Sequence, residues 1–153
     1  MAGVELYQQF LVKDDILLRD VFRIIDQPQQ LRCYLQREGL LGDFGGECDK
    51  CHNGTVSFVC EGEKKGKAQY SWKCGSTKCR ARISPRKDSF FEGSHLTDGQ
   101  IFGLIYSWVY RSPEDNVKRE LQIGSDHTLV DWFNFCRDIC CQILFQDNKK
   151  IGG

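Results

Sequence analysis

Apolar and polar residues in the first part of the chain alternate with the period of an α-helix. The apolar positions are Leu17, Val21, Ile24 and Ile25. Their spacing predicts a short helix within residues 14–39, capped by Asp14 or Asp15. A second short helix is expected to begin at Pro28, which suits a first helical turn, and to stop at Gly39.

The pattern changes in residues 43–93, where β-branched and aromatic residues alternate with polar ones. Three short runs have this character: TVSFV (55–59), QYSWKC (69–74) and RARIS (80–84). They predict strands, and the segment EGEKKGK between the first two is expected to be a mobile hairpin loop. Strands this short and few cannot hold together by apolar burial alone, so another device must fix them.

Helical spacing returns in residues 95–146. Thr97 and Gln100 form a capping box ahead of the apolar run IFGLIYSWVY. Ser112 is the expected N-cap of a second helix, and Ser125 that of a third. Three helices with a very short turn between the last two have the outline of a helix-turn-helix.

These elements predict an α+β fold made of N-terminal helices, a small antiparallel zinc ribbon and a three-helix helix-turn-helix unit. The expected boundaries are 1–42 for the N-terminal helical segment, 43–94 for the ribbon, 95–146 for the helix-turn-helix and 147–153 for a tail or linker.

Four of the nine cysteines are spaced as metal ligands. The motif CDKC supplies Cys48 and Cys51, and CGSTKC supplies Cys74 and Cys79 at the end of the expected hairpin. Two such pairs can complete one tetrahedral, structural zinc site. Cys60 and His52 remain rival ligands. Cys60, at the end of an apolar strand, is rather expected in the core, and His52 is expected to face solvent beside Cys51. Disulfides are disfavoured, because the N-terminus has no secretion signal and the number of cysteines is odd.

The net charge of zero conceals a cationic segment. Residues 64–87 carry nine basic side chains and no acid, whereas the rest of the chain carries 12 basic and 21 acidic ones. Arginine and lysine supply most phosphate contacts in nucleic-acid complexes. The expected DNA contacts here are Lys73, Lys78, Arg80, Arg82, Arg86 and Lys87.

The expected third helix, from Ser125 onward, has a polar start and an apolar stripe. In a helix-turn-helix the polar positions would face the major groove of double-stranded DNA; they are Ser125, His127, Thr128, Asp131, Asn134 and Arg137. Asp126 and Asp131 are an obstacle, because carboxylates repel phosphate, although an aspartate can accept a hydrogen bond from cytosine N4. The apolar stripe is core, or the seam of a homodimer.

Catalytic motifs are missing from the sequence. Neither the signature of zinc-dependent nucleobase deaminases nor His-Glu-x-x-His occurs, and GEKKGKA does not match a P-loop. No apolar run is long enough to span a membrane. We therefore expect a non-enzymatic binding protein, with a zinc-stabilised protein-interaction or dimerisation module as the alternative to DNA binding.

Two longer segments carry a family resemblance: WKCGSTKCRARISPRKDSFFEGSHLTDGQIFGLIYSW and VKRELQIGSDHTLVDWFNFCRDIC. Together they resemble the N-terminal part of Merlin-type transposases, eukaryotic relatives of bacterial insertion-sequence transposases, over roughly residues 45–150. The resemblance implies a nuclear protein whose zinc ribbon and helix-turn-helix bind the terminal inverted repeats of a transposon. In that family a DDE catalytic domain follows, and this chain stops about where that domain would begin.

Overall fold

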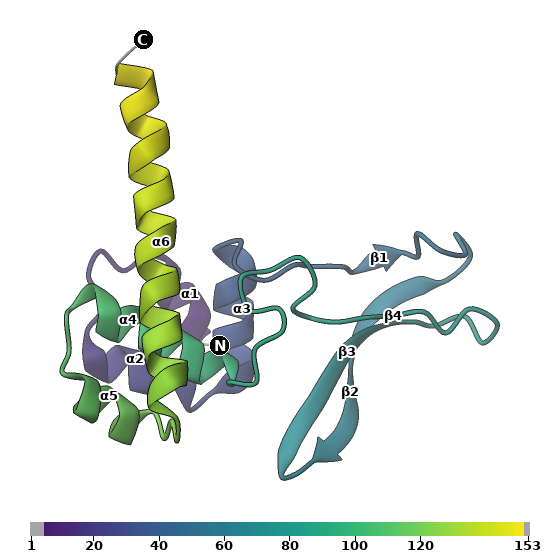
Figure 1. Ribbon diagram of the computed structural model, residues 1–153. Coiled ribbons are helices and arrows are strands. Elements are labelled where there is room, and N and C mark those ends of the chain that lie inside the picture. Colours follow the sequence, from purple (N-terminus) through teal and green to yellow (C-terminus); the bar gives the residue numbers. More distant parts are fainter. Residues whose placement is uncertain (1–4, 152–153) are drawn as a thin grey trace. The chain divides into compact units, whose positions relative to one another are not determined.

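The computed structural model describes residues 5–151 and confirms a mixed α+β fold. This part of the chain contains six helices and a sheet of four antiparallel strands (Figure 1). The elements fall into a helical unit, residues 5–31 with 95–151, and a sheet unit, residues 32–94. Across residues 5–151, no helix combines the length and apolar composition needed to cross a membrane.

Three helices open the chain: α1 (Leu6–Leu11), α2 (Leu18–Ile25) and α3 (Pro28–Arg37). The sequence pattern did not predict α1, and the cap expected from Asp14 or Asp15 was wrong. Instead, the carboxylate of Asp20 reaches back to accept from the Leu17 amide at 3.0 Å. The ammonium of Lys13 lies 2.6 Å from the same carboxylate and lowers the pKa of Asp20.

The capping box ahead of α4 (Asp98–Val109) is confirmed. The Thr97 hydroxyl accepts from the Gln100 amide at 3.1 Å, and the Gln100 side chain accepts from the Thr97 amide at 3.0 Å. Gln100 also donates to the carbonyl of Leu121 at 3.0 Å. One side chain therefore closes the start of α4 and ties it to the end of the next helix.

Helix α5 (Glu114–Glu120) begins one residue later than expected, with Pro113 rather than Ser112 at the N-cap. The amide of Ser112 instead donates to the carbonyl of Ser107 at 2.9 Å, so Ser112 belongs to the closing turn of α4. This turn passes through Arg111, whose φ of +54° is left-handed.

Helix α6 (Asp126–Ile151) starts where the sequence predicted. The hydroxyl of Ser125 accepts from the Thr128 amide at 3.4 Å. The helix does not stop at residue 146 but continues through Ile151.

One buried cluster of the helical unit lies between α4, α5 and the first half of α6. Its buried residues are Leu104, Val117, Leu121, Ile123 and Leu129. Two glycines bring helices close to α4: a Cβ at Gly99 would lie 2.9 Å from the Ile25 side chain, and one at Gly103 would overlap Leu121.

The sheet has the strand order β1-β2-β3-β4. Its strands are β1 (Gly46–Glu47), β2 (Thr55–Lys64), β3 (Lys67–Cys74) and β4 (Arg82–Ile83). The expected strands therefore form, with β1 added and β4 shorter than predicted.

The hairpin predicted between β2 and β3 forms, but its loop is shorter than the predicted EGEKKGK, because the strands continue into that segment. Lys64 pairs with Lys67 across a two-residue turn. The turn residues Lys65 and Gly66 have φ of +52° and +72°, as a type I′ turn requires. A register shift between Cys60 and Gly62 absorbs the extra residue as a bulge.

One face of the β2–β3 hairpin carries a buried cluster of the sheet unit. The ring of Phe58 lies 5.1 Å from that of Trp72 and stacks on Tyr70 at 5.3 Å. The guanidinium of Arg32, on α3, lies 4.0 Å above the Phe58 ring. These aromatic contacts continue into the buried cysteines Cys48 and Cys74.

Candidate metal centre

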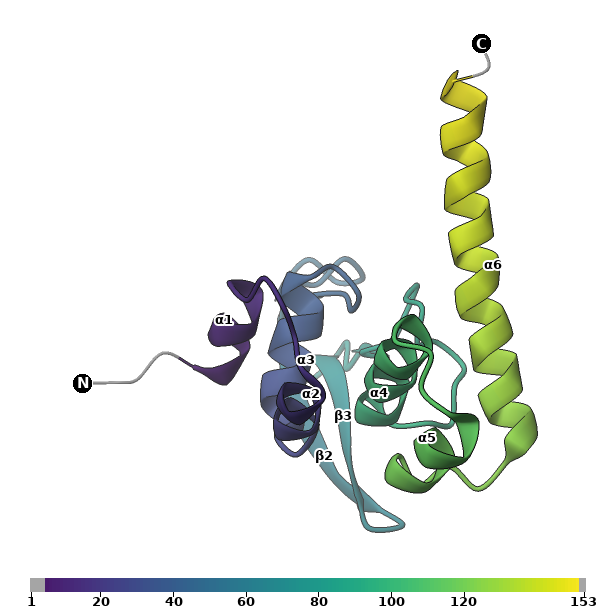
Figure 2. The same ribbon diagram turned by 90° about the vertical axis from the view of Figure 1, so that its left-hand side faces the viewer.

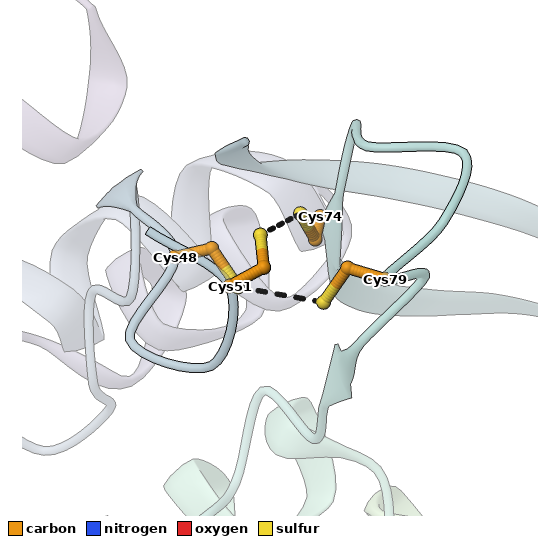
Figure 3. A group of neighbouring side chains, drawn as sticks. All are labelled: Cys48, Cys51, Cys74 and Cys79. Atoms are coloured by element: carbon orange, nitrogen blue, oxygen red, sulfur yellow. Dashed lines mark hydrogen bonds between the residues drawn. The ribbon is translucent and has the colours of Figure 1, made fainter. Parts of the chain in front are cut away.

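The four cysteines singled out by their spacing meet at one point, as Figure 3 shows. Cys48 and Cys51 come from the loop after β1, Cys74 ends β3, and Cys79 lies in the loop before β4. Their sulfurs all lie within 4.8 Å of one another. The sulfurs of Cys48 and Cys79 are 3.8 Å apart, and those of Cys51 and Cys74 are 3.7 Å apart.

These separations match a tetrahedral metal site. Zinc–sulfur bonds of about 2.3 Å place two sulfurs of a tetrahedron about 3.8 Å apart. A disulfide would need about 2.05 Å, and all nine cysteines are free thiols. The cluster is therefore consistent with zinc, and four sulfur ligands would leave no coordination position for a reacting water.

Backbone hydrogen bonds shape the first cysteine pair into a tight loop. The amide of Cys48 donates to the carbonyl of Gly54 at 2.9 Å, and the amide of His52 donates back to the carbonyl of Cys48 at 2.8 Å. His52 has a left-handed φ of +55°. The loop thereby turns both thiols toward the cluster.

The second cysteine pair forms a matching loop despite its wider spacing. The Cys74 amide donates to the Ala81 carbonyl at 2.9 Å, and the Arg80 amide donates to the Ser76 carbonyl at 3.1 Å. Arg80 follows Cys79 as His52 follows Cys51, and its φ is +49°. The turn closes on Ser76 rather than on the first cysteine, which accommodates the two extra residues of CGSTKC.

Backbone amides also donate to the sulfurs. The Ser76 amide lies 3.4 Å from the sulfur of Cys74, and the Ala81 amide donates to that of Cys79. The amide of Asn53 is the largest cause that lowers the pKa of Cys51 to about 7. Such donors favour a thiolate, the form that binds metal.

The pKa values of Cys74 and Cys79 move in the opposite direction. The Ser76 amide lowers the pKa of Cys74, but burial and the neighbouring thiols Cys51 and Cys48 raise it to a net value of about 11. Four thiolates so close together repel one another. Only a cation at their centre would let all four ionise at neutral pH.

Gly54 is a site residue that the sequence pattern did not identify. A Cβ built at this position would overlap the sulfur of Cys74 and lie 3.0 Å from the Cβ of Ser76. The two loops can close on a common centre only because this position lacks a side chain. The Asn-Gly dipeptide directly after CDKCH was the available signal.

The rival ligands lie outside the cluster. Cys60, expected in the core, is exposed, and its thiol lies 3.9 Å from the carbonyl of Gly62. The imidazole of His52 is exposed, as predicted for a solvent-facing loop residue, and its Nδ1 lies 3.0 Å from a carboxylate oxygen of Glu47.

The cations expected to contact DNA differ in what they bind. Arg82 pairs with Glu61 at 3.2 Å. Arg86 is half-buried and donates to the carbonyl of Ser94 at 3.0 Å, so it holds the loop after β4. In the described residues, 5–151, no ion pair forms at four of the cations: Lys73, Lys78, Arg80 and Lys87.

The polar residues at the start of α6 share one face. His127, Asp131 and Asn134 are exposed at spacings of four and three and lie opposite the buried Leu129. Thr128 is half-buried. The remaining members of the expected set are engaged locally: Ser125 caps the helix, and Arg137 donates to the side chain of Asn134 at 2.7 Å.

The obstacle posed by Asp126 is partly removed by a neighbour on α5. The ammonium of Lys118 lies 2.6 Å from the Asp126 carboxylate and lowers its pKa. This ion pair offsets a negative charge at the helix start.

Comparisons with protein-family models, with curated proteins and with solved structures found no significant match to this chain.

Proposed function

We propose that the chain is a zinc-stabilised DNA-binding module that combines a zinc ribbon with a helix-turn-helix. The observation that carries the proposal is the placement of unpaired cations on the metal-bound part of the sheet. Lys73 directly precedes one cysteine of the cluster, and Lys78 and Arg80 flank another. A metal that fixes the cysteines would fix these cations with them.

The charge of the metal centre supports this assignment. Four thiolates and one Zn²⁺ carry a formal charge of about −2, which neighbouring cations offset in part. Arg80 and Lys78 are exposed at the same time, so they can also meet the phosphates of a nucleic acid. Affinity by this route depends on charge and not on base sequence.

Helices α5 and α6, joined by the turn of residues 121–125, supply the proposed sequence-reading part. In a helix-turn-helix the second helix enters the major groove with its N-terminal residues. The exposed face with His127, Asp131 and Asn134 would then reach base edges. The first amides of α6 and the Lys118–Asp126 ion pair favour a nearby phosphate.

The resemblance to Merlin-type transposases makes double-stranded terminal inverted repeats the proposed target and the nucleus the proposed location. The module itself would be non-enzymatic, because its metal cluster is saturated with sulfur. A protein-interaction module is the second candidate, and the exposed apolar residues of α6 favour it.

The salt dependence of DNA binding tests the cationic surface. If Lys73, Lys78, Arg80 and Lys87 each neutralise one phosphate, log affinity should fall with log salt at a slope of about −4. The double variant Lys78→Ala/Arg80→Ala should reduce the slope by about 2 on all sequences alike. The control Arg19→Ala/Arg37→Ala removes the same charge from exposed helical positions and should leave the slope nearly unchanged. Equal slopes for both variants would refute a specific role for the cations that flank the cysteine cluster.

Base discrimination tests α6 separately. Replacing His127 and Asn134 by alanine should reduce the preference for a terminal repeat over random DNA by about 1–3 kcal/mol per lost base contact. The slope with salt should stay nearly unchanged, since the substitutions remove no lysine or arginine that would neutralise a phosphate. Unchanged discrimination would exclude α6 as the reading helix and leave the cationic surface unaffected as a proposal.

A further inference from the structure

The second half of α6 exposes large apolar residues to solvent. Ile143 is 53% exposed and Leu144 63%, and Cys140 and Cys141 are also exposed. Both views of the fold show this half of the helix extending past α4 and α5 (Figure 2). Surface helices of stable monomers place such residues against a core.

The exposed residues continue the stripe by which α6 is already packed. Leu129 and Cys136 are buried at 2% and 6% exposure, and Ile143 follows them at the same seven-residue interval. Residues seven apart lie on nearly the same face of a helix. Cys140 and Asp147 lie along this face as well, four residues beyond Cys136 and Ile143. The buried stripe thus becomes an exposed seam after Cys136.

We propose that this seam, residues 137–147 of α6, pairs with the same seam of a second copy of the chain in an antiparallel arrangement. The direction follows from where the helical unit lies. Its helices α4 and α5 pack on the face of α6 that carries Leu129. Two seams joined in parallel would drive the two helical units into the same space. Antiparallel pairing places each unit beyond the end of the other copy's seam.

The charges at the ends of the seam are self-complementary in this direction. Arg137 lies at one end and Asp147 at the other. Antiparallel overlap centred near residue 142 brings Arg137 of each copy opposite Asp147 of the other, so two ion pairs enclose the apolar segment. A parallel pair would instead face Asp147 with Asp147 inside the seam. A surface whose two ends complement each other is what a two-fold interface needs.

The pairing requires little change in the structure of the folded chain. Eleven helical residues give an overlap of about 17 Å, and the seam is already helical. Arg137 would exchange its hydrogen bond to Asn134 for a carboxylate of the second copy. The polar face with His127 and Asp131 lies on the opposite side of the helix, so pairing leaves it accessible.

An apolar-to-charged substitution tests the seam. Sedimentation equilibrium of the zinc-loaded full chain, in a non-thiol reductant that prevents disulfides, should give the mass of a dimer at concentrations on the order of 100 μM. Ile143→Asp should shift the mass to that of a monomer. The control Gln142→Asp adds the same charge one residue away, off the seam, and should remain dimeric. A monomeric parent protein, or equal effects of both substitutions, would overturn the proposal.

The direction of pairing is tested by removing one charge. Asp147→Asn should weaken the dimer about threefold to tenfold, because two exposed ion pairs are lost. The control Asp138→Asn removes the same charge from the opposite face and should change the dissociation constant by less than about twofold. A tighter dimer for Asp147→Asn would show parallel pairing and refute the arrangement. Circular dichroism and zinc content, which should match the parent, establish that the variants are folded.

Discussion

Replacing Gly54 by alanine tests whether the four cysteines act as one metal site. The added methyl group would overlap the Cys74 sulfur and would lie 3.1 Å from the Ser76 amide nitrogen. Gly54 does not have a left-handed φ, so alanine adds no backbone strain there. The whole effect must therefore come from displacing the atoms that the methyl group meets.

The free-energy cost of the added methyl group can be bounded from the general cost of overpacking a protein interior. Inserting a methyl group into a filled site costs about 1–3 kcal/mol. If the Cys74 sulfur moves to relieve the overlap, zinc affinity should fall roughly 5-fold to 150-fold, at 1.4 kcal/mol per factor of ten. The matched control is Gly75→Ala, because a Cβ at Gly75 meets only the Thr55 carbonyl oxygen, at 3.5 Å.

Competition with a chromophoric chelator measures the effect. Zinc should leave the Gly54→Ala protein at a lower chelator concentration than the parent, while Gly75→Ala should follow the parent. The Cys74→Ser variant sets the lower limit of zinc affinity, since it removes one of the four sulfur ligands. If Gly54→Ala binds zinc as tightly as Gly75→Ala, the close approach of the two loops has no part in metal binding, and the tetrahedral assignment fails.

Four further predictions follow from particular contacts. The pKa of Cys51 is lowered to about 7 and that of Cys74 is raised to about 11, so zinc binding near neutral pH must displace protons. In chelator titrations at several pH values, zinc affinity should therefore rise with pH, by up to about tenfold per pH unit for each proton displaced. Chelation should abolish hydrogen-exchange protection in β2 and β3 first, and the helical unit should keep its own. Gln100→Ala removes half of the capping box and the bond to Leu121, so thermal unfolding should show a loss of about 1–3 kcal/mol. Arg80→Gly should relieve the strain of the left-handed backbone and retain zinc, but it should weaken DNA binding. Parallel titrations with zinc and with DNA would separate the role of the backbone from that of the side chain.

The cysteine cluster could be predicted from the sequence because its geometry is local. Each pair needs only a tight turn, and the strands between Cys51 and Cys74 must form a hairpin that returns to its start. Spacing and β-type composition encode both requirements. The same argument explains why Cys60 was separated from the ligands, although its exposure was not foreseen.

The length of the loop at the hairpin tip was mispredicted because the charged residues and glycines of EGEKKGK indicated a mobile loop and not a tight turn. Lysine is an unusual first residue for a type I′ turn, which needs a left-handed φ, so the Lys65-Gly66 pair gave a weak signal. Once the aromatic residues of β2 and β3 are in register, however, the strands can extend toward the tip without a further cost of loop closure. Packing at the base of the β2–β3 hairpin thus determined a conformation that the sequence of its tip did not indicate.

The start of α2 shows a related limit of prediction from sequence. Asp14 and Asp15 precede an apolar helical pattern, as caps do, but the structure uses Asp20 from inside the helix. Asp20 also binds Lys13, whose position depends on the chain ahead of the helix. Capping that depends on a second partner cannot be decided from the spacing of one side chain.

The two cysteine loops carry the same backbone strain at equivalent positions. His52 and Arg80 each follow the second cysteine of a pair, and each has a left-handed φ near +50°. A side chain there costs on the order of 1 kcal/mol relative to glycine. The imidazole of His52 meets Glu47, whereas Arg80 extends into solvent without an ion pair in residues 5–151. The strained backbone is common to both loops and therefore serves the cysteine cluster, whereas the exposed Arg80 side chain is the one that the proposed function assigns to an anionic partner.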